Sequence, residues 1–217
     1  LAQLIDTPID KIQSLVDSLN AVALFVHTNP LQEVMQVEGT PQFRGGIEAL
    51  SQLCDQLTVP VVFKETGCGF SFETLRRLDK IGLYAVDVAG LGGTHWGRIE
   101  GGRNGQDPIK NTAANSFKNW GISTVESLQN ASLLPMKSYK VWASGGVRTG
   151  LDVAKCIYLG AECVGLAKPL LDAAVESEEK LDETMAAIEF ELKVALFCSG
   201  CDSLNGLSQL NTAVVKG

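Results

Sequence analysis

The chain has 217 residues, of which 45% are hydrophobic and 20% are charged, and its formal net charge is −7. This composition is typical of a globular domain, and no window reaches the roughly 18 consecutive apolar residues that a membrane-spanning helix needs. The acidic balance excludes the clustered basic surface that binds nucleic acids. We therefore expect a single domain over residues 1–217 that is cytoplasmic and has neither a membrane nor a nucleic acid as partner.

Five short apolar runs alternate with segments of helical periodicity, which predicts stacked βα units around a parallel sheet. The expected strands are Val22–His27, Pro60–Glu65, Tyr84–Ala89, Lys140–Ala143 and Cys163–Ala167, with the remnant of an earlier strand at Leu1–Leu4. The expected helices are Ile9–Leu19, Gly46–Leu57, Phe72–Ile81, Val125–Leu133 and Leu151–Leu159, followed by helical sequence from about Leu170 to Phe197.

Residues 90–118 interrupt this alternation, because they are rich in glycine and have little apolar periodicity. A loop of this length in a compact domain is usually functional or disordered. The polar and aromatic residues among its glycines, such as His95, Trp96 and Glu100, favour a loop that closes over a ligand.

Polar clusters follow four consecutive predicted strands, and this distribution decides between two arrangements of the sheet. An open doubly wound sheet gathers its functional groups at one switch point, whereas a (β/α)8 TIM barrel gathers them at the carboxyl ends of many strands. We therefore predict an α/β fold of the TIM-barrel type, with the first two or three βα units absent from this chain.

The first polar cluster, "HTNPLQE", follows the strand that ends at His27. A helix start explains Asn29 as the cap, with proline after it, and Glu33 as a first-turn acid. It leaves His27 and Gln32 unexplained, which indicates a functional role for the stretch.

The next two clusters contain a lysine and a glycine-rich turn. Lys64 ends a buried apolar run, so its ammonium needs a partner, which is Glu65, a phosphate, a carboxylate or the electron-rich edge of a flavin. Thr94 follows Gly92 and Gly93, whose backbone N–H groups can approach a ligand closely.

The last two predicted strands end in small residues directly before helix starts. Gly145 and Gly146 follow one strand, and Ala167 follows the other. Two such turns place backbone N–H groups around a single anion, as in the phosphate site after the last strands of a barrel. We predict a phosphate site here, with Arg148 adding positive charge.

Six cysteines stand singly in helical or strand-like segments, which indicates free thiols in a reducing compartment. Only Cys198 and Cys201 have the C-x-x-C spacing. A zinc site would need further ligands, and a redox pair would follow a strand at the start of a helix. We interpret this pair as structural.

Together the runs resemble type 2 isopentenyl diphosphate isomerases, which are FMN-dependent (β/α)8 barrels. The resemblance rests on "HTNPLQEVMQVEG", "PVVFKETGCGFS", "VDVAGLGGTHWGRIEGGR", "WGIST" and "SGGVRTGLDVAKCIYLGA", in the order of the family. It implies the interconversion of isopentenyl and dimethylallyl diphosphate by double-bond migration, with reduced FMN and Mg²⁺, NADPH as reductant, and a homo-oligomer that is a tetramer or larger.

The same resemblance implies a role for individual residues. It implies that Gln32 and Glu100 are catalytic, that Glu33 is the metal ligand, and that His27, Asn29 and Gln32 bind the substrate. The implied FMN contacts are Lys64, Thr94, Gly145, Gly146, Arg148, Ala167 and Lys168. His95 departs from the family pattern, where a small polar residue is more usual.

Two alternatives to this isomerase remain open from the sequence. One is another FMN-dependent barrel, such as a hydroxy-acid oxidase or a dihydroorotate dehydrogenase, which would need a histidine or cysteine base facing the flavin and usually an arginine for the substrate carboxylate. The other is a non-catalytic, truncated FMN-binding remnant. In this alternative the βα units that would precede Leu1 are absent, so the barrel does not close.

Overall fold

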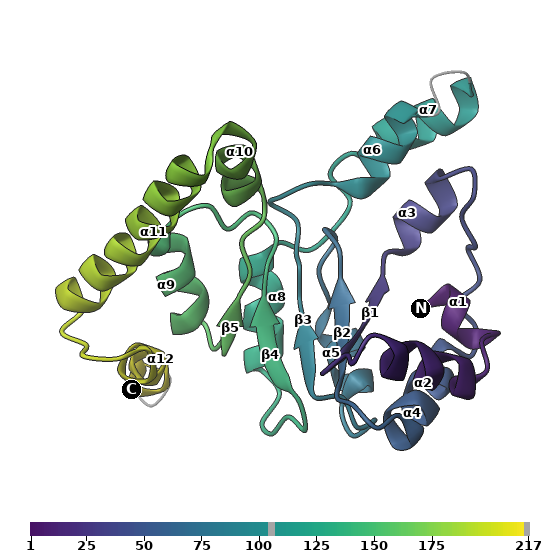
Figure 1. The fold of residues 1–217 in the computed structure, drawn as a ribbon, viewed down its shortest axis with the longest axis horizontal. Helices are drawn as coiled ribbons and strands as arrows, with labels where there is room; N and C mark the ends of the chain where they lie inside the picture. The colour runs from purple at the N-terminus through teal and green to yellow at the C-terminus, as the bar shows by residue number, and fades with distance from the viewer. Residues whose placement is uncertain (104–106, 215–217) are drawn as a thin grey trace.

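A computed structural model describes residues 1–103 and 107–214, which form one curved parallel sheet flanked by helices (Figure 1). The strands are β1 (Leu24–Thr28), β2 (Val61–Glu65), β3 (Ala85–Asp87), β4 (Lys140–Ala143) and β5 (Cys163–Val164). They pair in the order β1-β2-β3-β4-β5, so each strand lies beside the next one in the chain. This order is typical of a barrel wall, because a doubly wound sheet reverses its order at a switch point. All five predicted strands are confirmed, with ends that differ by a few residues.

The strand register places the polar ends of neighbouring strands side by side. His27 is the pairing partner of Lys64, and Lys64 is in turn the partner of Asp87. Side chains of directly paired residues point to the same face of a sheet. The register therefore brings the first three polar clusters of the sequence to one edge and one face.

The helices that connect the strands agree with the predicted periodicity. They are α2 (Ile9–Ser18), α4 (Gly46–Gln56), α5 (Phe72–Leu78), α8 (Thr124–Ser132) and α9 (Gly150–Tyr158). Ser71 caps α5 by accepting a hydrogen bond from the Thr74 N–H, and Thr149 forms a capping box with Asp152 at the start of α9. None of the helices in the described residues is long and apolar enough to cross a membrane.

Two predictions about the N-terminal and central segments are wrong. Residues 1–4 do not form a strand; they belong largely to α1 (Ala2–Ile5), which buries Ala2 and contacts α4. A short apolar run does not distinguish a strand from a helical turn, so packing decides. The segment predicted as a loop over residues 90–118 contains α6 (Trp96–Arg103) and α7 (Pro108–Ser116), and its residues 104–106 lie outside the described residues.

The glycines of α6 explain why the sequence pattern is misleading there. A Cβ added to Gly101 would lie 2.1 Å from the Cβ of Ala114 on α7, and one added to Gly97 would lie 2.6 Å from Leu31. These glycines therefore allow close approach between helices, although glycine lowers the intrinsic helix propensity. Leu31 belongs to α3 (Pro30–Met35), so α3, α6 and α7 pack as one group (Figure 1).

The helical sequence predicted from Leu170 to Phe197 forms two helices. They are α10 (Lys168–Glu176) and α11 (Glu178–Cys198), separated at Ser177, which caps α11 by accepting a hydrogen bond from the Lys180 N–H. A final helix, α12 (Leu204–Val214), packs with α11 against α9. The six cysteines are free, as predicted.

The main core lies between the sheet and helices α4, α5 and α8. Phe63, Leu53, Leu75 and Leu128 are each no more than 2% exposed within it. Burial of side chains of this size stabilises a fold by about 1.5–3 kcal/mol each relative to exposure. This core fixes the helix-facing side of the strands, which leaves the carboxyl ends of the strands for other contacts.

Truncation of Leu128 to alanine is expected to lower the free energy of unfolding by about 2–5 kcal/mol, because the residue is 1% exposed and leaves a cavity. The matched control is Leu133→Ala at the end of the same helix, where the leucine is 67% exposed. We expect the control to change stability by less than about 1 kcal/mol. Urea unfolding of both variants measures the difference, and equal losses would contradict this assignment of the core.

Candidate functional site

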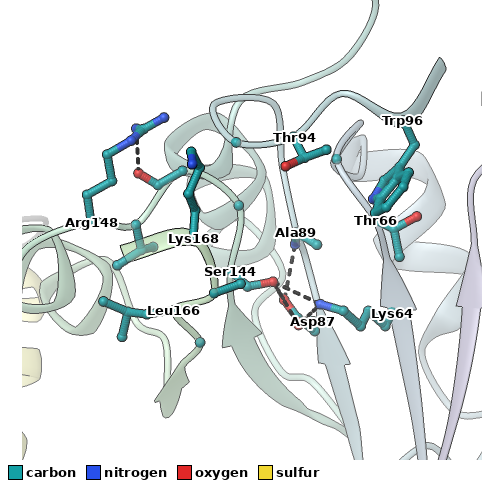
Figure 2. A pocket seen from close by; sticks show the side chains of 17 residues that line it. Lys64, Thr66, Asp87, Ala89, Thr94, Trp96, Ser144, Arg148, Leu166 and Lys168 are labelled. Atoms are coloured by element: carbon teal, nitrogen blue, oxygen red, sulfur yellow. Dashed lines mark hydrogen bonds and ion pairs between the residues drawn. The ribbon is translucent and has the colours of Figure 1, made fainter. Parts of the chain in front are cut away.

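A cavity of about 610 Å³ lies at the carboxyl ends of β2, β3, β4 and β5 (Figure 2). Its walls come from the turns that follow these four strands and from the first residue of α10. In TIM barrels this end of the strands carries the ligand site, because the turns there can change without disturbing the core. The cavity volume is in the range of ligand pockets, which is about 300–1,000 Å³.

Residues from separate sequence motifs meet in this cavity. Lys64 and Thr94, from the second and third polar clusters, lie on one side, and the turn after β4 and the start of α10 lie on the other (Figure 2). The predicted cofactor residues that line it are Lys64, Thr94, Gly145, Gly146, Arg148, Ala167 and Lys168. The prediction thus selected positions that the fold brings together from four βα turns.

A hydrogen-bonded network of three side chains lies at the floor of the cavity (Figure 2). The Lys64 Nζ atom donates to Asp87 Oδ2 at 2.5 Å and to Ser144 Oγ at 2.9 Å. Ser144 Oγ in turn lies 2.9 Å from both carboxylate oxygens of Asp87. The three residues come from β2, β3 and the end of β4, so the network joins three neighbouring strands.

The turn after β4 has a backbone conformation that only glycine adopts easily. Gly145 has φ +92° and Gly146 has φ +81°, and both meet the turn after β3. A Cβ on Gly145 would lie 2.4 Å from the carbonyl oxygen of Gly90, and one on Gly146 would lie 2.6 Å from the backbone of Gly92. Because these glycines have no side chain, an anion in the cavity can approach the backbone of Gly145 and Gly146 closely.

Arg148 bridges these two turns. Its guanidinium donates to the carbonyl oxygens of Gly146 at 2.9 Å and of Gly92 at 3.1 Å. The Thr124 hydroxyl also holds the turn after β4, because it donates to the carbonyl oxygens of Ser144 and Gly145. The arginine therefore has a structural role in holding the turns together, in addition to the charge that it brings to the cavity wall.

The turn after β2 is organised around the buried carboxylate of Glu65. Glu65 is 2% exposed, and its carboxylate accepts a hydrogen bond from the Cys68 N–H. Burial raises the pKa of Glu65 to about 7, although hydrogen bonds from the backbone of the turn oppose the rise. Among the partners that the sequence leaves open for Lys64, Glu65 is not the one found in the structure, since Lys64 pairs with Asp87.

Protein stability is expected to decrease as the pH rises from about 4.5 to 7 because of Glu65. The native state keeps a proton on this carboxyl that the unfolded state has already released, so unfolding becomes easier by about 3 kcal/mol across this window. Glu65→Gln mimics the protonated form and should remove this part of the pH dependence. Urea unfolding of both proteins at pH 5 and pH 8 measures it, and identical slopes would contradict the assignment.

Thr66, directly after Glu65, is a cavity residue that the sequence did not single out. It lines the cavity, and its hydroxyl oxygen is buried without a hydrogen-bond partner in the described part of the chain. A buried hydroxyl without a partner costs about 1–3 kcal/mol, so a polar ligand that supplies the partner would be stabilised. This orphaned hydroxyl and the glycine turns fit a polar, phosphate-bearing cofactor.

The residues after β1 form a second group, beside the cavity rather than in its wall. Asn29 is 1% exposed and caps α3, since its Oδ1 atom accepts from the Gln32 N–H at 2.9 Å. Its amide also donates to the Thr66 carbonyl oxygen at 3.3 Å. Glu33 accepts a hydrogen bond from the Thr40 N–H at 2.8 Å, and His27 is exposed on β1.

Glu100 of α6 is close to this group. It is 3% exposed, and its two oxygens contact Gln32 Nε2 at 3.5 Å and Arg103 Nη1 at 2.7 Å. The α3–α6 packing thus brings together the two residues that the resemblance marks as catalytic. His95 has a structural position, because its ring bonds the Trp120 carbonyl oxygen and accepts from the Arg98 N–H near the start of α6.

The donor set after β1 does not form a closed metal cage. No group of three or more His, Cys, Asp and Glu side chains is placed to hold a metal ion within residues 1–103 and 107–214. Mg²⁺ usually keeps several waters and binds through one or two carboxylates plus phosphate oxygens of a substrate. A single carboxylate such as that of Glu33 fits an ion that arrives with a diphosphate.

Comparison with known proteins identifies the class. The family model described as "FMN-dependent dehydrogenase" matches residues 27–214, and the chain belongs to this family. A flavocytochrome b2 structure with benzoylformate has a TM-score of 0.64 at 20% identity, over 91% of this chain and 49% of that one. This likeness concerns the fold, and it confirms the TIM-barrel class that the sequence predicted.

In sequence the chain is similar to members of a narrower group. It is 55% identical over 210 residues to the isopentenyl-diphosphate delta-isomerase of Legionella pneumophila strain Corby, which covers 96% of this chain and 61% of that protein. It is 52% identical over 207 residues to the protein of the same name from Bdellovibrio bacteriovorus, of which it covers 59%. The resemblance seen in the motifs is confirmed, and the chain spans about 60% of the length of these relatives.

Proposed function

We propose that the chain is part of an FMN-dependent isopentenyl-diphosphate delta-isomerase that moves a double bond between isopentenyl and dimethylallyl diphosphate. The observation that carries the proposal is the 55% identity to the Legionella pneumophila isomerase over nearly the whole chain. The cavity at the strand ends supports it, because its walls contain the lysine, the threonine and the glycine turns of the family motifs. FMN is also the cofactor that the family description names.

FMN would bind in the cavity with its phosphate at the turns after β4 and β5. The backbone of Gly145 and Gly146, which carries no side chain, and the start of α10 are suited to a phosphate, and Arg148 and Lys168 supply positive charge. Lys64 and Thr94 would contact the flavin ring from the other wall, with Lys64 facing its electron-rich edge. When bound and reduced, FMN would supply an electron-rich surface beside the alkene.

The substrate would lie between this cavity and the group after β1. Glu33 would hold Mg²⁺ together with the diphosphate, and His27 and Asn29 would stand near the diphosphate. Isomerisation needs one group that gives a proton to the alkene and one that removes a proton from the allylic carbon. The Gln32 amide and the Glu100 carboxylate, 3.5 Å apart, are the groups of this chain that we assign to positioning and proton handling.

Three further properties belong to the same proposal. NADPH would act as the reductant that keeps the flavin reduced, because isomerisation consumes no electrons and reduction is needed only to prime the cofactor. The protein would act in the cytoplasm, where the small diphosphate is its partner. The active form would be a homo-oligomer, a tetramer or larger.

The test is turnover of isopentenyl diphosphate by the full-length protein loaded with FMN and reduced under anaerobic conditions. We expect dimethylallyl diphosphate to form with a requirement for Mg²⁺ and without net oxidation of the substrate. Oxidation of a 2-hydroxy acid instead would favour the alternative of a hydroxy-acid oxidase.

A further inference from the structure

Asp87 occupies a position at the cavity floor that the proposed function does not use. Its side chain is 9% exposed, and one of its oxygens contacts the Lys64 ammonium at 2.5 Å. The other oxygen accepts a hydrogen bond from the Ala89 N–H at 3.1 Å, in a turn where Ala89 has φ +32°. The carboxylate is thus held from two sides, and its orientation does not depend on Lys64 alone.

The lysine has one N–H group left for a ligand after its contacts within the network. An ammonium carries three N–H donors. Within the network, Lys64 donates to Asp87 and to Ser144. The Lys64 side chain is 30% exposed and lines the cavity, whereas the carboxylate of its partner lies deeper. A molecule in the cavity would therefore contact the Lys64 ammonium, whose positive charge is partly neutralised by the deeper Asp87 carboxylate.

We propose that Asp87 is a positioning residue that acts through Lys64 and limits how strongly the cavity favours the reduced, electron-rich form of FMN over the oxidised form. This inference rests on the proposed function, because it takes FMN as the occupant of the cavity. An opposite charge close to the ammonium reduces the net positive potential at the cavity floor. Without Asp87 the same ammonium would attract a reduced flavin more strongly.

Ser144 allows the charge and the position of Lys64 to be separated. Its hydroxyl is an acceptor for the lysine at 2.9 Å and lies at the same distance from the carboxylate. When Asp87 is replaced by asparagine, the lysine keeps Ser144 Oγ and the amide oxygen of the new residue as acceptors, while the contact with the Ala89 N–H is lost because the amide nitrogen does not accept. The substitution therefore removes a negative charge with little change in shape.

The experiment measures the dissociation constants of oxidised FMN and of dithionite-reduced FMN for the full chain, and compares their ratio between proteins. In Asp87→Asn we expect the preference for reduced FMN to rise by at least about tenfold, which corresponds to about 30 mV for a two-electron couple. A purely structural role for Asp87 would change both dissociation constants together and leave the ratio unchanged. If Asp87→Asn does not fold, Asp87→Ser removes the same charge and must shift the ratio in the same direction.

Two controls test whether the effect passes through the lysine. In a Lys64→Met background there is no ammonium for Asp87 to offset, so adding Asp87→Asn should change the ratio by less than about threefold. Asp79→Asn removes a carboxylate that accepts from Ser138 and does not line the cavity, and it should leave the ratio unchanged.

The outcomes separate the inference from the function on which it rests. If the unaltered protein binds neither form of FMN, the proposed function fails and the inference fails with it. If the unaltered protein binds FMN but Asp87→Asn leaves the ratio within about threefold, or lowers it, the proposed function stands and the inference is wrong. A shift of equal size in the Lys64→Met background would also overturn it, because Asp87 would then act without the lysine.

Discussion

Gly145→Ala is expected to destabilise the protein by about 3 kcal/mol, because a non-glycine residue is strained at φ +92° and its Cβ would lie 2.4 Å from the Gly90 carbonyl oxygen. The turn after β4 must then move away from the turn after β3. Since both turns line the cavity, we also expect FMN binding to weaken at least about tenfold. Thermal or urea unfolding and a fluorescence titration with FMN measure the two effects.

The matched control for Gly145→Ala is Gly160→Ala. Gly160 has a similar backbone conformation, with φ +98°, but an added Cβ would meet no atom within 4 Å, and the residue does not line the cavity. We expect this control to cost about 1 kcal/mol of strain and to leave the affinity for FMN unchanged. If both variants lose flavin equally, the close contact between the two turns is not what shapes the site.

Glu33→Gln is expected to raise the Mg²⁺ concentration that the proposed isomerase activity requires, through about a 10- to 100-fold loss of apparent metal affinity in the full-length protein. The substitution removes the negative charge on α3 but keeps an oxygen that can accept from the Thr40 N–H. FMN should remain bound, because Glu33 does not line the cavity. Magnesium titrations of turnover, together with the flavin absorption spectrum, test both statements.

Glu38→Gln is the control for the metal assignment. Glu33 lies within α3, and Glu38 lies shortly after the end of this helix. The Glu38 carboxylate is exposed and pairs with Arg103 at 3.4 Å. Its loss should leave the magnesium titration unchanged. Release of flavin from Glu33→Gln, or an equal effect of the two substitutions on the titration, would show that Glu33 acts on the fold or on the general charge instead of the metal.

The fold was predictable where local patterns and tertiary packing agree. The strands and their flanking helices follow the alternation of apolar runs and helical periodicity, and caps such as Ser71 mark the helix starts. The helix α6 was not predictable, because its glycines lower helix propensity and their purpose is visible only against Leu31 and Ala114. The same holds for the break between α10 and α11, which depends on a serine cap inside a continuous periodic pattern.

The candidate site was predictable to the extent that its residues belong to motifs. Lys64 and the glycine pair at 145–146 stand out because their positions conflict with the apolar or regular sequence around them. Asp87 ends a buried strand in the same way as Lys64, and this shared position was the available signal for their pairing. Thr66 had no such signal, because its unsatisfied hydroxyl follows from the packing of the turn after β2.

Asn29 connects the group of residues after β1 to the wall of the cavity. Its side-chain oxygen caps α3, and its side-chain NH2 group donates to the backbone carbonyl oxygen of Thr66, which lines the cavity. Neither segment can open without breaking a contact of this one buried side chain, so their amide protons should exchange with solvent as a single cooperative unit. Occupation of the cavity should accordingly slow hydrogen exchange in α3, a helix that does not touch the cavity.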